Sequence, residues 1–123
     1  MPVDPNEELA RFAVEKSYFR ADNTVRHNAY MPGREKAVSV FRQSGLTEAE
    51  IWELGVTRVA KHRDKPLLGR AVIHVYHVLS QELSVESAEP PPRHANILGW
   101  PHEHEKQKEK ALELAARGTF VRR

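Results

Sequence analysis

The clearest pattern in the chain is a helical one over residues 48–63, where apolar residues recur at spacings of three and four. Thr47 and Glu50 match the capping box that begins many helices, in which each side chain accepts a hydrogen bond from the backbone N–H of the other residue. Leu46 stands where it can pack against Ile51 as a hydrophobic staple. The spacing therefore predicts a helix over 48–63. Its apolar stripe consists of Trp52, Val56, Val59 and Ala60.

Two further helices are predicted near the ends of the chain. Asp4 is a suitable N-cap, a proline follows it, and Glu7 stands at the capping-box position, so the pattern predicts a helix over residues 5–16. A charged helix is predicted over residues 101–117, because a proline opens the segment and Gly118 follows its end. The apolar face of the first of these helices consists of Leu9, Phe12 and Ala13.

The segments between the helices have patterns typical of extended chain. Residues 36–43 alternate in polarity, and residues 68–79 are rich in valine, isoleucine and leucine, so both are predicted as strands. We expect a short strand or a turn over residues 83–88. A further short strand or extended segment is expected over residues 94–98, after a run of three prolines.

This order of elements predicts an α+β fold, in which a small mixed or antiparallel sheet is packed by the helix over 48–63. A chain of 123 residues has the size of one ordinary domain, so residues 1–123 are expected to form a single unit. The last residues, 118–123, are expected either to fray or to add an edge strand.

Composition excludes several classes of protein. The chain has no cysteine, which rules out disulfides, thiolate metal sites and cysteine nucleophiles. It has no signal-peptide pattern and no apolar run of the roughly 20 residues that cross a bilayer. We therefore expect a soluble, cytoplasmic protein with no membrane partner. Glycine-rich phosphate loops and dinucleotide-binding fingerprints are also missing, so no cofactor is expected.

Charge is nearly balanced over the whole chain but not along it. The formal net charge is only +2, which is too small to indicate a nucleic-acid-binding protein by itself. The segment from residue 20 to residue 42, however, has more bases than acids, and most of the bases are arginines, which suit bidentate contacts with phosphate. These bases are Arg20, Arg26, Arg34, Lys36 and Arg42.

Two short polar clusters resemble each other and lie in predicted loops or at their edges. Each places an arginine, a histidine and an asparagine within four residues, close to prolines that limit the freedom of the chain. Loops held by a rigid scaffold often carry binding and catalytic groups, so the two clusters form the predicted site. The first cluster is Arg26, His27, Asn28 and Tyr30, and the second is Arg93, His94 and Asn96, with Trp100 nearby.

If the two clusters converge, they predict binding of an anionic ligand such as a nucleotide or RNA. Their arginines would neutralise phosphate, Asn28 and Asn96 would donate hydrogen bonds, and Tyr30 or Trp100 would offer a ring for base stacking. Arg20, Arg34 and Arg42 would extend the positive surface. His27 and His94 would then be candidate acid and base for metal-independent cleavage of RNA or another phosphodiester.

Two other interpretations stay open. The chain could be a non-catalytic protein-interaction domain, with the narrow apolar stripe of the helix over 101–117 as part of its surface. Metal binding is the weaker alternative: His74 and His77 face opposite ways on a regular strand, and His102 and His104 diverge on a helix. We therefore predict no metal site.

Overall fold

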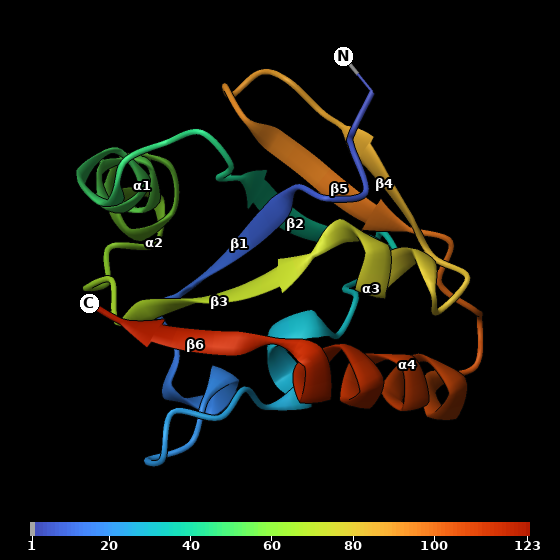
Figure 1. Ribbon diagram of the computed structural model, residues 1–123. Helices are drawn as coiled ribbons and strands as arrows, with labels where there is room; N and C mark the ends of the chain where they lie inside the picture. The colour runs from blue at the N-terminus through green and yellow to red at the C-terminus, as the bar shows by residue number, and fades with distance from the viewer. Residues whose placement is uncertain (1) are drawn as a thin grey trace.

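The centre of the fold is an antiparallel sheet of six strands in the order β4-β5-β2-β1-β3-β6 (Figure 1). The computed structural model describes residues 2–123 of the chain. Helices accompany the sheet, so the predicted α+β class is confirmed. The strands are β1 (Glu8–Ala13), β2 (Val38–Arg42), β3 (Gly69–His74), β4 (Ser84–Ser87), β5 (His94–Leu98) and β6 (Thr119–Arg122).

The predicted helix over 48–63 is confirmed as one continuous helical segment. It consists of α1 (Glu48–Gly55), a π turn η3 (Val56–Ala60) and α2 (Lys61–Arg63). The predicted capping box is present, because the Glu50 backbone N–H donates to Thr47 Oγ1 at 3.2 Å and the Thr47 N–H donates to the Glu50 carboxylate at 2.9 Å. The remaining helical elements are η1 (Lys16–Tyr18), η2 (His27–Tyr30), α3 (Val75–Leu79) and α4 (His104–Arg117).

The predicted N-terminal helix over residues 5–16 is wrong, because the segment forms β1 in the middle of the sheet. Asp4 and Glu7 do exchange hydrogen bonds, but these bonds close a single turn: the Asp4 N–H donates to the Glu7 carboxylate and the Glu7 N–H donates to the Asp4 carbonyl. A central strand is buried on both faces, so its apolar residues need not alternate with polar ones. That lack of alternation made the segment look helical.

The predicted strand over residues 68–79 is correct only in its first half. Beyond His74 the chain turns into α3. The strand paired with β3 is β1, and because β1 begins at Glu8, residues after His74 have no partner on it for strand hydrogen bonds. The N–H groups of Val75 and Tyr76 instead donate to the carbonyls of Glu7 and Pro5 in the N-terminal turn. Of the alternatives expected over 83–88 and 94–98, the structure has the strand in both cases, as β4 and β5.

The C-terminal segment forms a helix followed by an edge strand. α4 lies within the predicted range 101–117, and the N–H of Gly118 donates to the carbonyl of Leu114 at its end. Residues 119–122 then pair with β3 as β6, which is the edge-strand alternative for the end of the chain. None of the helices in residues 2–123 has the length and apolar character needed to cross a bilayer.

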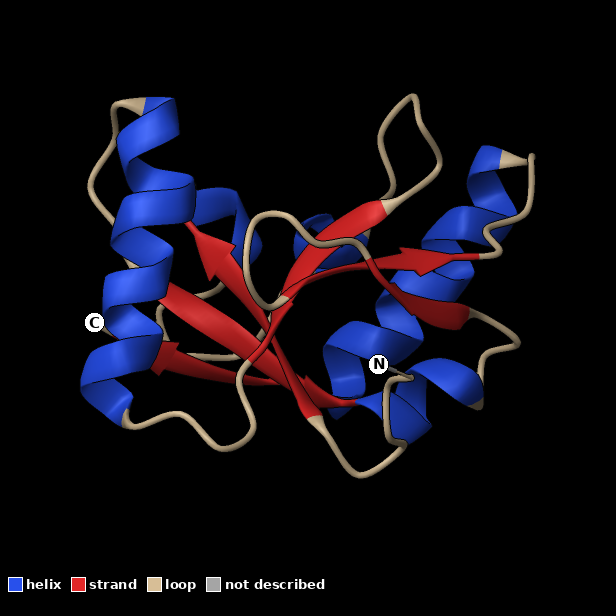
Figure 2. Ribbon diagram, turned by 90° about the horizontal axis from the view of Figure 1, so that it is seen from above, coloured by secondary structure: helices blue, strands red, loops and turns tan. Residues whose placement is uncertain are grey.

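Each face of the sheet carries its own apolar core, and helical elements lie on both sides of the sheet (Figure 2). We call the first side the α4 face, where α4 packs over buried strand residues such as Leu9 and Ile73. The second side is the α1 face, where the helix over 48–63 packs over Phe12 and Phe41. This division decides which of the predicted site residues can meet.

Candidate functional site

The first polar cluster lies on the α4 face. Its residues His27, Asn28 and Tyr30 belong to η2, which packs against α4, and Arg26 is the N-cap of η2. Ala29 and Tyr30 are fully buried in the core of that face, and Arg11 of β1 fixes the turn by donating from Nε to the Ala29 carbonyl at 2.9 Å. The side of η2 that stays accessible therefore consists of Arg26, His27 and Asn28.

His27 is surrounded by positive charge. Partial burial lowers its pKa, and the nearby charges of Lys108, Arg26 and Arg20 lower it further, with a smaller contribution from His104. Lys108 and His104 belong to α4, while the arginines come from the loop before η2. The packing of α4 on η2 thus brings bases from two distant parts of the chain to one place.

The second polar cluster lies on the α1 face and its groups are engaged with the protein itself. Arg93 donates from one guanidinium nitrogen to the carbonyl of Ser44 at 2.9 Å. The His94 ring lies beside the Phe41 ring and is tilted against it, with ring centroids 5.4 Å apart, and His94 also contacts Ser39. Asn96 is the cross-strand partner of Ser39, so it occupies the same face.

The structure does not bring the two clusters together. η2 packs on the side of the sheet that α4 covers, whereas the His94 ring lies over Phe41 on the other side. His27 and His94 therefore do not share one anion-sized space. Tyr30 and Trp100 are core residues with exposures of 0% and 6%, and neither presents a ring face for base stacking.

The three arginines expected to extend the positive surface have different surroundings. Arg42 makes a two-pronged ion pair with Glu7, with both nitrogen–oxygen distances at 2.8 Å, so its charge is neutralised. Arg34 is exposed in the turn before β2. Arg20 is exposed, acts on His27, and also borders a hollow that the sequence interpretation missed.

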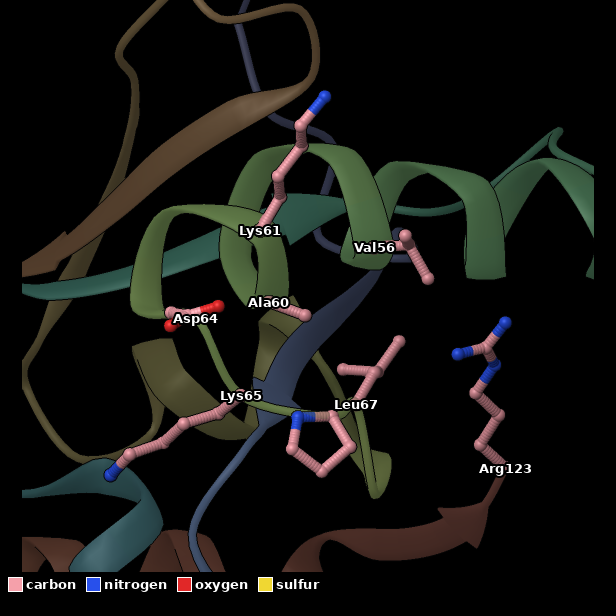
Figure 3. A pocket seen from close by; sticks show the side chains of 8 residues that line it. Val56, Ala60, Lys61, Asp64, Lys65, Leu67 and Arg123 are labelled. Atoms are coloured by element: carbon pink, nitrogen blue, oxygen red, sulfur yellow. The ribbon is translucent and has the colours of Figure 1, made fainter.

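Two adjoining hollows run beside β6 and share Leu67 and Arg123. The first has a volume of about 490 Å³ and lies between the end of the helix over 48–63 and the turn that follows it (Figure 3). In Figure 3 the side chains of Lys65 and Arg123 extend on either side of Leu67. The second has a volume of about 500 Å³ and reaches Arg20. The charged residues that line the pair are Lys16, Arg20, Lys61, Asp64, Lys65, Arg122 and Arg123.

Several of these bases lack an acidic partner. Lys65 is paired with Glu15, and Arg122 donates to Asn23 and lies over the Phe19 ring. Within residues 2–123, by contrast, Lys16, Lys61 and Arg123 make no ion pair. Among the described residues that line the two hollows, Asp64 is the one acid, so their surface is positive.

Through Arg20 this positive surface continues to the first polar cluster, because Arg20 both lines the second hollow and acts on His27. We call the combined surface the basic strip. Acids also lie along it: Glu15, which holds Lys65 and Arg63, and Asp22, whose pKa is lowered by hydrogen bonds from Thr24. The basic strip consists of Lys16, Arg20, Arg26, Lys61, Lys108, Arg122 and Arg123, and it surrounds the His27 imidazole, whose pKa it lowers.

The remaining histidines do not form a metal centre in the described chain. Because the strand ends at His74, the ring centroids of His74 and His77 lie 6.4 Å apart. The Glu8 Oε2 lies 3.8 Å from the His74 Nε2. Among residues 2–123, even so, no group of three or more histidine and carboxylate side chains is placed to hold a metal ion.

Comparison of the chain with models of protein families, with curated proteins and with solved structures finds no match. The arrangement of residues is therefore the basis for any statement about function.

Proposed function

We propose that the protein binds an extended polyanion of the RNA type along the basic strip. The observation that supports this proposal is the convergence of Lys16, Lys61 and Arg123, three exposed bases without acidic partners, around two adjoining hollows. They come from η1, from α2 and from the residue that follows β6, so it is the fold that gathers them. Exposed bases without partners are the groups that exchange counterions for phosphates.

The strip has features that suit a chain of phosphates better than a single one. Its bases extend from the hollows through Arg20 to the surroundings of His27. The Arg122 guanidinium is already held by Asn23 and the Phe19 ring, so less side-chain entropy is lost when it contacts an anion. The accessible bases indicate contacts with the backbone of a nucleic acid, which give affinity without sequence preference.

This proposal keeps the anionic ligand expected from the sequence but changes the site. The second polar cluster is left out, because it lines neither hollow and its Arg93 guanidinium donates to the backbone carbonyls of Arg42 and Ser44. Cleavage of RNA by a His27–His94 pair is not proposed, because the sheet separates the two imidazoles. The cytoplasmic location expected from the sequence stays a prediction.

Binding of a short single-stranded RNA, measured by fluorescence anisotropy at a series of salt concentrations, tests the proposal. We expect saturable binding at low salt, with the logarithm of the association constant falling linearly as the logarithm of salt rises. Replacing Lys16 or Lys61 with alanine should lower that slope by about 0.7 for each phosphate that the variant no longer neutralises. A mononucleotide measured in parallel should bind much more weakly, because it engages fewer bases.

α4 offers a matched pair of control variants. Lys108 is near enough to His27 for its charge to lower the pKa of that imidazole, whereas Lys106 lines a separate hollow with Gln81 and Pro101. Both side chains are exposed, so both lysine-to-alanine changes remove one charge at little structural cost. We expect K108A to weaken RNA binding and K106A to leave it nearly unchanged. Absence of binding at low salt, or equal weakening by the two variants, would contradict the proposal.

A protein-interaction role is the second candidate, and one observation favours it. Tyr76, Leu79 and Leu112 are large apolar side chains with exposures of 43% to 46%, and they lie on α3 and α4, which contact each other. Solitary exposed apolar residues are normal, but neighbouring ones mark interaction surfaces. L79S and L112S should leave RNA binding unchanged; a loss of RNA binding in either variant would show that this surface belongs to the same site.

A further inference from the structure

Ser39 and His94 form a close pair on neighbouring strands. Ser39 lies on β2 and His94 on β5, and the Ser39 Oγ is 2.7 Å from the His94 Nε2. In the antiparallel register Phe41 stands opposite His94 and Asn96 stands opposite Ser39, so all four side chains share the α1 face. The contact is therefore a diagonal one across two paired strands.

The second ring nitrogen of His94 settles which group donates in this pair. Nδ1 lies 3.0 Å from the carbonyl oxygen of Ala88. A carbonyl oxygen can only accept a hydrogen bond, so Nδ1 carries the hydrogen of the neutral imidazole and Nε2 carries the lone pair. The Ser39 hydroxyl consequently donates to Nε2. A serine that donates to an imidazole, which is itself oriented by a third group, has the geometry of an activated nucleophile.

The surroundings hold the base and leave the hydroxyl open. The His94 ring lies 5.4 Å from the Phe41 ring between centroids, and the backbone carbonyl of His94 accepts from the Ala88 N–H at 2.9 Å. His94 is thus fixed by backbone pairing and by ring packing, whereas Ser39 is exposed to solvent. An exposed oxygen next to a fixed base can be reached by a reagent from outside.

We propose that Ser39 is a nucleophile, activated by His94, that accepts an acyl group from a carboxylic ester. This activity is separate from the proposed RNA binding, because Ser39 and His94 do not belong to the basic strip. Asn96 stands directly across from Ser39, and its side-chain amide is the donor suited to the oxyanion that forms during the transfer.

Ser39 and His94 account for every bond and proton in the acyl transfer. Ser39 Oγ forms a bond to the ester carbonyl carbon while its proton passes to His94 Nε2. The carbon–oxygen bond to the leaving alcohol then breaks, and the alcohol oxygen takes that proton from His94. The products are acyl-Ser39 and the free alcohol, with His94 neutral again. Water can attack the acyl-Ser39 by the same route and release the acid.

Incubation of the full chain with p-nitrophenyl acetate, followed by mass spectrometry of its peptides, tests the proposal. Ser84 is a built-in control, because it is exposed on the adjacent strand β4, is placed on the same face by the register, and has no histidine partner among the described residues. We expect acetylation of Ser39 to be at least about a hundredfold faster than that of Ser84, in line with the usual contribution of a positioned base. Equal rates at the two serines would overturn the proposal.

Variants separate catalysis from structure. S39A should abolish the acetylated peptide that contains residue 39 without changing the far-ultraviolet circular dichroism spectrum. H94A should slow acetylation of Ser39 at least about tenfold, and added imidazole should restore part of the rate. A merely structural His94 would give no rescue by imidazole, which would contradict the proposal. If H94A fails to fold, the comparison of Ser39 with Ser84 in the natural chain still decides.

Discussion

The ring of Phe12 lies directly beneath Gly55. A Cβ built on Gly55 would stand 2.6 Å from two ring carbons of Phe12 and 2.8 Å from a methyl carbon of Leu67. Real side chains do not approach so closely, so the absence of a side chain at this position sets how near the helix over 48–63 can come to β1. This close packing completes the core of the α1 face.

Substitution of Gly55 by alanine should therefore destabilise the protein although alanine favours helices. The gain in helix propensity is about 1 kcal/mol, whereas overpacking of the core against the buried Phe12 ring costs about 1–3 kcal/mol. Urea unfolding should show a net loss of stability for G55A. G33A is the matched control, because a Cβ at Gly33 meets open space. Equal stability of the two variants would contradict the packing.

Substitution of Tyr30 and of Tyr18 by phenylalanine gives a second matched comparison. The Tyr30 hydroxyl is buried without a hydrogen-bond partner in residues 2–123, and its burial raises the pKa of the phenol. The Tyr18 hydroxyl, in contrast, accepts from Arg11 at 2.9 Å. We expect Y30F to stabilise the protein by about 1 kcal/mol and Y18F to destabilise it by about 1 kcal/mol. Thermal unfolding of both variants gives the comparison; a shift of equal sign would contradict it.

The Glu7–Arg42 ion pair should make stability depend on pH in the acid range. The hydrogen bond from Arg42 holds the pKa of the Glu7 carboxyl below its ordinary value, and both side chains are only 15% exposed. A lowered folded-state pKa adds stability above the pKa of the unfolded chain, and this contribution is lost as the pH falls through the folded-state value. E7Q should cost about 2 kcal/mol at neutral pH.

Urea unfolding from neutral pH down to about pH 2 measures this contribution. The difference between the natural chain and E7Q should shrink as the pH falls, because the side chain at position 7 is then uncharged in both proteins. A difference that stays constant over the whole range would show that the pair contributes nothing through its charge.

The capping box predicts the effect of two threonine substitutions in one helix. Thr47 accepts from the Glu50 backbone N–H at the start of α1, so T47A should destabilise the protein by about 1 kcal/mol. The Thr57 hydroxyl donates to the carbonyl of Glu53 inside the helical segment, where carbonyls already accept the backbone hydrogen bonds of the helix. T57A should therefore be nearly neutral or slightly stabilising. Urea unfolding distinguishes the two, and a larger loss of stability for T57A would contradict the capping role.

The sequence predicted the helices that are specified by residues close to one another in the chain. The capping box and staple predicted the helix over 48–63, and the helix over 101–117 ends where Gly118 follows it. The segment over 5–16 was mispredicted because its pattern is decided by burial on both faces, which depends on neighbouring strands. For the same reason the sequence could not show that the ladder with β1 stops at His74.

The predicted site could not be placed correctly from the sequence either, because its position depends on contacts between distant segments. Two similar Arg-His-Asn strings reveal which residue types are present, but not the face of the sheet on which they lie. In β5 the alternation of a strand directs His94 and Asn96 to the α1 face, next to Ser39. Lys61 and Arg123 were not singled out at all, because they lie far apart in the sequence. Only the pairing of β6 with β3 brings Arg123 beside Leu67.

The sequence by itself therefore determined the α+β class, the positions of the two long helices and most strands, and the excess of arginine over residues 20–42. These properties follow from spacing and from hydrogen bonds between residues close in the chain. The tertiary structure decided which polar groups meet: the bases that line the basic strip, and the separate pair of Ser39 and His94. Strand order and register set those meetings, and both result from packing between distant segments, which no local pattern encodes.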